Sequence, residues 1–276
     1  MCCLMACSNS TKANAESAIP TTTEKKAAEA QVQTKQSDPD ETSFENGVLT
    51  VKGVRYEMIL VEGGTFTMGA WPKVTDADPC ERPTRKVTID YNYYIGKTEV
   101  TVGLWKAITG SFPPGQEGED LREAVDNVSM DDVISFFEDL NGLFGPIFST
   151  PTEEEWEFAA RGGNKSKGFV YSGSDNLTDV ACNEEGNIVA HANKVATKRP
   201  NELGLYDMSG NVWEWCTNEG KDVLRGGNCT CREGLCRVSN RQEAPTIEAF
   251  RDRYSALIGL RLRVIEGWEK ALEEGI

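Results

Sequence analysis

The feature that most constrains the fold is a mixture of short strand patterns and two capped helical segments within one stretch of chain. "MILVEGGTFTMG" at 58–69 predicts a strand, a Gly-Gly turn and a second strand. Two helices are predicted after Ser129 and Thr152, because an acidic residue follows each of them at capping-box spacing. Strand patterns return at 211–216 and 258–264. The mixture predicts an α+β fold.

The first predicted helix has one apolar face. Its apolar residues fall at i, i+3, i+4 and i+7, the spacing of a helix that packs against a core. They are Val133, Phe136, Phe137 and Leu140. The second helix is expected to end at the pair Gly162–Gly163.

The charge balance restricts the partners of the chain. Lys plus Arg is 29 and Asp plus Glu is 44, a net charge of −15 over 276 residues. Proteins that bind nucleic acids carry a basic surface, so we expect no nucleic-acid partner. No run of about 18 apolar residues occurs, so we expect no transmembrane helix. The single histidine, His191, argues against His-rich metal sites and a Ser-His-Asp triad.

The N-terminal region divides into an anchor and a tether. Leu-Met-Ala-Cys at 4–7 fits a bacterial lipobox, which predicts a lipid anchor at Cys7; a chance cluster of cysteines is the alternative. We therefore expect a truncated signal at 1–7, a disordered tether at 8–44 and a folded domain at 45–276. The tether has almost no large apolar residues and cannot bury a core. Such an anchor predicts a surface-exposed protein of the bacterial cell envelope, which contacts the membrane only through its lipid.

Three cysteines lie close together in "RGGNCTCREGLCRVSNR". Cys231 and Cys236 are separated by four residues, and Cys229 lies just upstream. This spacing is compatible with a catalytic or metal-binding pair, with a disulfide between the two, or with a disulfide from either one to Cys182 or Cys216. Spacing alone leaves these alternatives open.

Several stretches together resemble one known family. In chain order they are "MILVEGGTFTMG", "YYIGKTEVTVGLWKAITG", "NVSMDDV", "STPTEEEWEFAARGG", "NELGLYDMSGNVWEWC", "VLRGG", "CRVSNR" and "IGLRLRV". Over nearly all of residues 48–265 the chain resembles the formylglycine-generating-enzyme (sulfatase-modifying-factor) family. The resemblance implies the modified C-type-lectin-like fold of that family, a compact α+β domain with little regular secondary structure. It leaves the activity open, because that fold serves both oxidases and binding proteins.

The C-terminal part also resembles the retroelement-diversified variable proteins that share this fold. Their variable segments contain "LRGG", a diversified run, "CRVSNR", a second run and "G-F-R-L", and this chain follows that order. The resemblance implies a lipoprotein displayed at the cell surface that binds an unknown protein or glycan through loops at about 228–257. We expect this protein to be a monomer and to have no catalytic activity. An ordinary solvent-exposed loop is the alternative. The expected ligand-binding residues are Cys229, Thr230, Cys231, Arg232, Leu235, Phe250, Asp252, Tyr254, Ser255 and Leu257.

A third possibility is a structural envelope lipoprotein of the same fold. The main alternative function is that of the catalytic family members. In these oxidases, two cysteines after "RGG" bind copper(I) and convert a cysteine of a sulfatase to formylglycine. Cys231 and Cys236 fall at the same offset here, and thiolates are ligands that select Cu(I). The chain departs from the catalytic pattern at Asn228, where the enzymes have serine, and at Arg232, where they have histidine. These departures favour the binding function.

One further stretch, "YDMSGNVWEW", suits a structural calcium ion. Carboxylates and backbone carbonyls on a tight loop are the ligands of a hard cation. By resemblance, the site would use the side chains of Asp207 and Glu214 and the carbonyls of Gly210 and Val212. The alternative is that Asp207 caps a turn and Glu214 accepts from backbone amides. The two tryptophans of the stretch are expected in the core.

Overall fold

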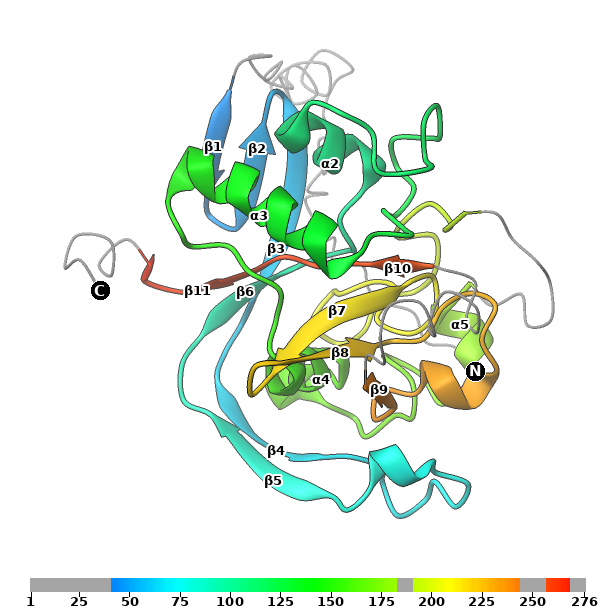
Figure 1. Cartoon of the computed structure of the whole chain (residues 1–276). Helices are drawn as coiled ribbons and strands as arrows, with labels where there is room; N and C mark the ends of the chain where they lie inside the picture. The colour runs from blue at the N-terminus through cyan, green and yellow to red at the C-terminus, as the bar shows by residue number, and fades with distance from the viewer. Residues whose placement is uncertain (1–40, 183–190, 244–256, 269–276) are drawn as a thin grey trace, which may run out of the picture. The chain divides into compact units, whose positions relative to one another are not determined.

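Short strands and few helices make up residues 41–182, 191–243 and 257–268, which the computed structural model describes (Figure 1). The strands are β1 (Thr42–Glu45), β2 (Val48–Val51), β3 (Val54–Val61), β4 (Gly64–Met68), β5 (Arg85–Ile89), β6 (Tyr93–Gly96), β7 (Trp213–Asn218), β8 (Lys221–Arg225), β9 (Arg241–Glu243), β10 (Ile258–Gly259) and β11 (Arg263–Ile265). The α-helices are α2 (Val102–Thr109), α3 (Met130–Phe144), α4 (Glu153–Ala160) and α5 (Leu177–Val180). Three short 3₁₀ turns are η1 (Pro79–Glu81), η2 (Gly163–Lys165) and η3 (Glu233–Cys236). The structure confirms the predicted α+β class with little regular secondary structure.

The described strands form three sheets. The largest has the order β1-β2-β3-β6-β11, so the strand nearest the C-terminus lies beside β6. The second has the order β10-β7-β8-β9, in which β10 pairs with β7 in parallel, and β4 pairs with β5 alone. Helices α2 and α3 lie together over one side of the largest sheet, and α4 lies beside β7 and β8 (Figure 1).

Both predicted capping boxes are confirmed. The Ser129 hydroxyl accepts from the Asp132 backbone N–H, and the Asp132 carboxylate accepts from the Ser129 N–H at 2.8 Å. Thr152 and Glu155 make the same pair of bonds at the start of α4. Of the predicted apolar face of α3, Phe137 is half-buried and the other three residues are buried: Val133, Phe136 and Leu140.

The two strands predicted in "MILVEGGTFTMG" exist as β3 and β4, and they belong to different sheets. Gly63 lies between them. A β-carbon at this position would lie 2.6 Å from the Ile89 carbonyl oxygen and 2.7 Å from that of Tyr91. Only glycine allows the backbone to approach these carbonyl groups so closely. The chain can therefore pass close to the end of β5 as it goes from β3 of the largest sheet to β4 of the two-stranded sheet.

The start of the fold differs slightly from the predicted boundary at residue 45. Strand β1 begins at Thr42, which pairs with Val51 of β2, so this part of the predicted tether is ordered by the sheet. The lipobox, Cys7 and the tether up to residue 40 lie outside the described residues. Within the described part of the chain, no helix has the length and apolar character needed to span a membrane.

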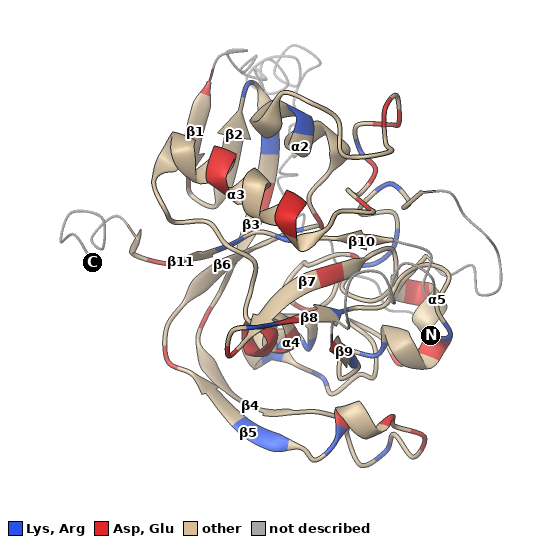
Figure 2. Ribbon diagram, viewed as in Figure 1, with Lys and Arg blue, Asp and Glu red and all other residues tan. Residues whose placement is uncertain are grey.

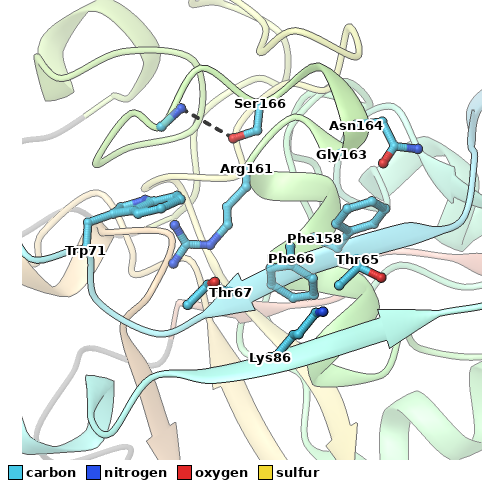
Figure 3. Close-up of a pocket in the computed structure, with 11 residues that line it drawn as sticks. Thr65, Phe66, Thr67, Trp71, Lys86, Phe158, Arg161, Gly163, Asn164 and Ser166 are labelled. Carbon is cyan, nitrogen blue, oxygen red and sulfur yellow. Dashed lines mark hydrogen bonds between the residues drawn. The ribbon is translucent and has the colours of Figure 1, made fainter.

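The described surface carries a basic segment and a pocket, and strand β5 contributes to both. Figure 2 shows acidic residues spread over several helices and loops and a basic segment on β5. Residues of β4, β5 and α4 line a pocket of about 480 Å³, which Figure 3 shows.

Candidate functional site

The loop that carries the three cysteines begins directly after β8, at Gly226 and Gly227. Gly227 has a φ of +72°, and a β-carbon there would lie 2.8 Å from the Leu235 carbonyl oxygen and 2.9 Å from the Cys236 sulfur. Since a side chain would push these atoms away, glycine lets the loop turn back against η3. The "RGG" sequence therefore places Cys236 beside the end of β8.

All three cysteine side chains of this loop are buried. The exposed fraction is 0% for Cys229, 5% for Cys231 and 0% for Cys236. Cys231 and Cys236 belong to the main apolar core, together with both tryptophans of β7, which are buried as predicted. The Cys236 thiol donates to the Asn228 carbonyl oxygen at a distance of 3.8 Å. Apolar side chains therefore enclose these sulfur atoms and separate them from solvent.

The predicted ligand-binding residues divide into three groups. Cys229, Cys231, Leu235 and Leu257 are buried in the core, which favours a packing role over the predicted contact with a ligand. Phe250, Asp252, Tyr254 and Ser255 lie outside the described residues. Thr230 and Arg232 reach solvent. Of the predicted ligand-binding residues that the structure describes, Thr230 and Arg232 are therefore the two that a partner can reach.

The exposed tip of the loop consists of Thr230, Arg232 and Glu233. The Thr230 N–H and hydroxyl donate to the Asn228 side-chain oxygen at 3.1 and 3.0 Å. The Arg232 side chain is 53% exposed and pairs with Asp78 at 2.7 Å. Glu233 is exposed beside it, although the sequence analysis did not select this residue. The tip thus presents two opposite charges and a hydroxyl.

The segment after the loop is fixed to η1 by polar contacts. Arg237 donates to Glu81 at 3.1 Å and to Asp76 at 2.5 Å, and the Ser239 hydroxyl donates to Glu81 at 2.5 Å. Asn240 donates to Asp78 at 3.1 Å. The Glu81 side chain is buried, and its contacts with Arg237 and Ser239 fix the segment "CRVSNR" in place. No local signal predicts this contact, since Arg237 and Glu81 are 156 positions apart.

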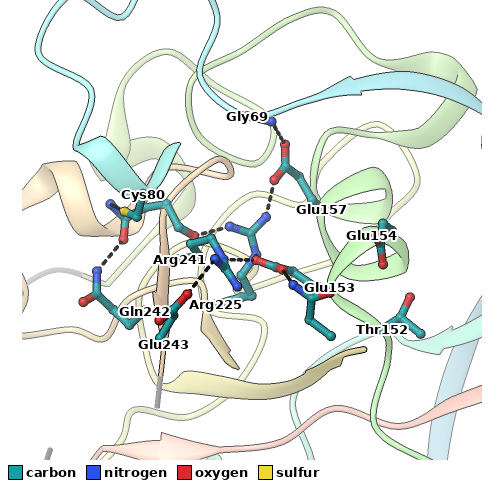
Figure 4. Close-up of polar contacts among 12 residues, drawn as sticks. Gly69, Cys80, Thr152, Glu153, Glu154, Glu157, Arg225, Arg241, Gln242 and Glu243 are labelled. Carbon is teal, nitrogen blue, oxygen red and sulfur yellow. Dashed lines mark hydrogen bonds and ion pairs between the residues drawn. The ribbon is translucent and has the colours of Figure 1, made fainter. Parts of the chain in front are cut away.

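A second polar network joins strands β8 and β9 to helix α4 (Figure 4). The guanidinium of Arg225 is fully buried and pairs with Glu157, while Arg241 donates to Glu153 at 2.6 Å. Burial lowers the pKa of Arg225, but the nearby carboxylates of Glu157 and Glu153, together with the Cys216 sulfur and the hydrogen bond to Glu157, raise the pKa overall. Arg225, the last residue of β8 and the arginine of "RGG", therefore stays charged and ties this strand to the helix. The strand and the helix together hold the base of the cysteine loop.

The predicted calcium ligand Glu214 has other partners. Its carboxylate is fully buried and accepts from Arg261 at 2.6 and 2.9 Å and from the Trp156 indole N–H at 2.8 Å. The Glu214 charge helps to raise the pKa of Arg261 despite the burial of this guanidinium. Both carboxylate oxygens of Glu214 are thus used by side chains of the protein, and its charge is balanced.

The other predicted calcium ligands surround this ion pair. Asp207 has a φ of +58° and accepts from the Ala196 N–H at 2.7 Å. Burial raises the pKa of Asp207 to about 6, against the lowering effect of the Ala196 bond. Gly210 and Val212 lie in the same turn, where both are buried. Among the described residues, no group of three or more His, Cys, Asp and Glu side chains is arranged to hold a metal ion. The calcium site stays a prediction, which the pairing of Glu214 with Arg261 and Trp156 disfavours.

Replacing Asp207 by asparagine is expected to stabilise the fold at pH 7 by about 1–3 kcal/mol. Asparagine tolerates the positive φ, keeps an acceptor for the Ala196 N–H and removes a charge that burial disfavours. The folded-state pKa is raised from 3.8 to about 6. The ionisation cost of Asp207 is therefore absent below about pH 4, grows between about pH 4 and pH 6, and stays constant above that range. Urea denaturation of both proteins over this pH range measures the difference.

The same pair of proteins tests the calcium prediction. If Asp207 held Ca²⁺, added Ca²⁺ would raise the Tm of the wild-type chain by several degrees, and the asparagine variant would lose this gain. We expect instead that Ca²⁺ and a chelator leave the Tm of the wild-type chain within about 1 °C, because Glu214 is already paired with Arg261.

Together, these features define an α+β domain of short strands in which a glycine-bounded cysteine loop is folded into the core. The family described as "Sulfatase-modifying factor enzyme 1-like domain" matches residues 50–264. The chain therefore belongs to this family, which confirms the resemblance found in the sequence.

Three known proteins are similar to the chain. The "Chaperone protein LppX" of Paenibacillus barcinonensis is 32% identical over 209 residues, which cover 58% of this chain and 70% of that protein. The "Formylglycine-generating enzyme" of Streptomyces coelicolor is 34% identical over 119 residues, which cover 31% of this chain and 37% of the enzyme. The solved structure of Treponema denticola variable protein 1 aligns with a TM-score of 0.63 at 24% identity, covering 79% of this chain and 98% of that one. This last likeness establishes the fold.

Proposed function

We propose that this chain is a binding protein of the bacterial cell envelope that contacts its partner through the exposed tip at Thr230, Arg232 and Glu233. The observation that carries the proposal is the division of the loop into two sides. Its cysteines are enclosed in the core, and its charged residues face solvent. A loop held from below by buried contacts can vary in its exposed residues while the fold is retained.

The comparisons support this proposal. One relative is named a chaperone, which favours a protein as the partner over a glycan. One structure of the same fold is named a variable protein, which supports diversification of the loop region at about 228–257 by a retroelement. Lipid anchoring at Cys7 and surface display complete the proposal, as the lipobox pattern suggests.

The runner-up is a copper-dependent formylglycine-generating oxidase that uses Cys231 and Cys236. The offset of the two cysteines and the likeness to the Streptomyces enzyme favour this function. The copper ion of such an enzyme needs an open position for the substrate cysteine and for oxygen. The exposed fractions of 5% and 0% argue against that access.

The binding proposal predicts that Arg232→Ala/Glu233→Ala weakens partner binding at least about tenfold, because a few residues carry most of the energy of an interface and arginine is frequent among them. The Tm should fall by less than about 2 °C, since the Arg232–Asp78 pair is exposed and exposed pairs contribute little. The measurement is cross-linking of the full chain to envelope proteins of its own cells, followed by the affinity for the cross-linked partner.

The matched control is Arg55→Ala/Glu117→Ala, which also removes one exposed residue of each charge. It should leave partner binding unchanged. Equal loss of binding in both double variants would show a general charge effect and contradict a contact at the tip. Oxygen-dependent conversion of a Cys-x-Pro-x-Arg peptide with copper supplied, lost in Cys231→Ser, would establish the oxidase instead.

Diversification of the loop has its own genetic test. We expect an imperfect copy of the codons for residues 225–262 beside a reverse-transcriptase gene, differing from the coding sequence where the template has adenine. If the flanking DNA contains no such copy, the retroelement part of the proposal is wrong, and the binding experiment above is unaffected.

A further inference from the structure

Residues of β4, β5 and the end of α4 line a pocket that combines aromatic and basic side chains (Figure 3). Its volume of about 480 Å³ is in the range of small-molecule sites. The chain has a net charge of −15, yet the lining contains Lys86 and Arg161 and no carboxylate. A pocket of this kind favours an anion.

Aromatic side chains form the apolar part of the pocket. The rings of Phe66 and Phe158 lie 5.2 Å apart, and the Arg161 guanidinium lies over the Trp71 ring at 4.9 Å from its centroid. Phe158 is buried, whereas Phe66 is half-buried. A bound molecule can therefore pack against the exposed part of the Phe66 ring. An apolar or planar group therefore has a surface to lie on.

Two buried N–H groups of the pocket lack an acceptor. Arg161 Nη1 and Trp71 Nε1 have no hydrogen-bond partner among the described residues. The remaining guanidinium nitrogens are fixed: Nε and Nη2 donate to Glu157 at 2.8 and 2.6 Å, and Nη2 also donates to the Gly69 carbonyl oxygen. Buried donors without an acceptor are rare in folded proteins because they are costly. An oxyanion supplies the missing acceptor.

Arg161 shares its ion-pair partner with a second arginine. Glu157 is its ion-pair partner, and the same carboxylate also pairs with Arg225. Lys86, on the neighbouring strand, is exposed and forms no ion pair with a described residue. Two positive charges thus face the same hollow from β5 and from the end of α4.

We propose that this pocket binds a small molecule that carries a carboxylate on an aromatic group. The carboxylate accepts from Arg161 Nη1 and Trp71 Nε1 and lies near the Lys86 ammonium, and the aromatic group covers Phe66. Because both donor nitrogens are covered in this structure, the Trp71 ring shifts when the carboxylate enters. The site is distinct from the tip of the cysteine loop and does not rest on the proposed function.

The test uses phenylacetate as the probe and titration calorimetry of the full chain. We expect a Kd on the order of 0.1–1 mM, as is typical of a ligand of this size. Phenylacetamide, which has the same ring without the charge, should bind at least about tenfold more weakly. Acetate should also bind more weakly, because it lacks the ring.

Two variants locate the site. Lys86→Ala removes an exposed charge, and Trp71→Phe removes the indole N–H while keeping a ring against Arg161; each should weaken phenylacetate binding about tenfold. Lys165→Ala is the matched control, because Lys165 is exposed nearby and does not line the pocket. Trp71→Phe should also abolish the change in tryptophan fluorescence that phenylacetate causes in the wild-type chain.

Three results would overturn the proposal. The first is no saturable binding of phenylacetate up to about 10 mM, well above the expected Kd. The second is equal binding by the wild-type chain, Lys86→Ala and Trp71→Phe, which would place the probe elsewhere. The third is sulfate binding as tightly as phenylacetate, which would show a site for inorganic oxyanions without a role for the aromatic wall.

Discussion

Replacing Arg261 by methionine is expected to lower the free energy of unfolding by about 3–5 kcal/mol. Arg261 and Glu214 are both fully buried, and two hydrogen bonds of 2.6 and 2.9 Å join them. Methionine fills the space of the side chain and leaves the Glu214 carboxylate buried with only the Trp156 N–H. It also removes the bonds of Arg261 to the carbonyl oxygens of Gly96 and Tyr206. Urea denaturation measures the loss.

The matched control is Arg85→Met, because the ion pair of Arg85 with Glu154 lies at the surface. This variant should lose at most about 1 kcal/mol. Adding Glu214→Gln to Arg261→Met removes the unbalanced charge and should recover part of the stability. If Arg261→Met were no less stable than Arg85→Met, the Glu214 carboxylate would need another positive partner, and the predicted calcium ion would be the first candidate.

The elements that the sequence predicts correctly depend on local contacts. Ser129 with Asp132, and Thr152 with Glu155, are three residues apart, so each capping box can be recognised without knowing the rest of the fold. Helix α2 carries a local signal of the same kind. Thr101 caps this helix by accepting from Leu104, and glycine follows its last residue.

The parts that the sequence could not predict depend on distant residues. Glu214 suits a calcium ligand in its own loop, and its partner Arg261 is 47 positions away. The cysteines suit a metal pair by spacing, but Cys231 and Cys236 are buried in a core cluster that also contains both tryptophans of β7. Residue type and spacing indicate what a side chain can do, whereas its partners in the fold determine which of these possibilities remains.

Replacing Glu157 by glutamine is expected to lower the free energy of unfolding by a similar amount, about 3–5 kcal/mol. One Glu157 oxygen accepts from the Gly69 N–H and from Arg161, and the other pairs with Arg225. Glutamine has nearly the same shape, so the packing of α4 is retained. It removes the negative charge between two buried guanidinium groups and turns an amide N–H₂ toward one of them. The measurement is again urea denaturation at pH 7.

Glu154→Gln is the control, because Glu154 lies on the same helix and its ion pair with Arg85 is at the surface. Its expected loss is at most about 1 kcal/mol. A large loss of unfolding free energy in Glu157→Gln alone would mean that the buried Glu157 charge holds β8 to α4 through Arg225. It would also mean that this charge fixes the base of the cysteine loop, because Arg225 is the last residue before the glycines of that loop. If both variants lost the same small amount, Arg225 and Arg161 would be balanced by Glu153 and by backbone carbonyls, and the base of the loop would depend on apolar packing instead.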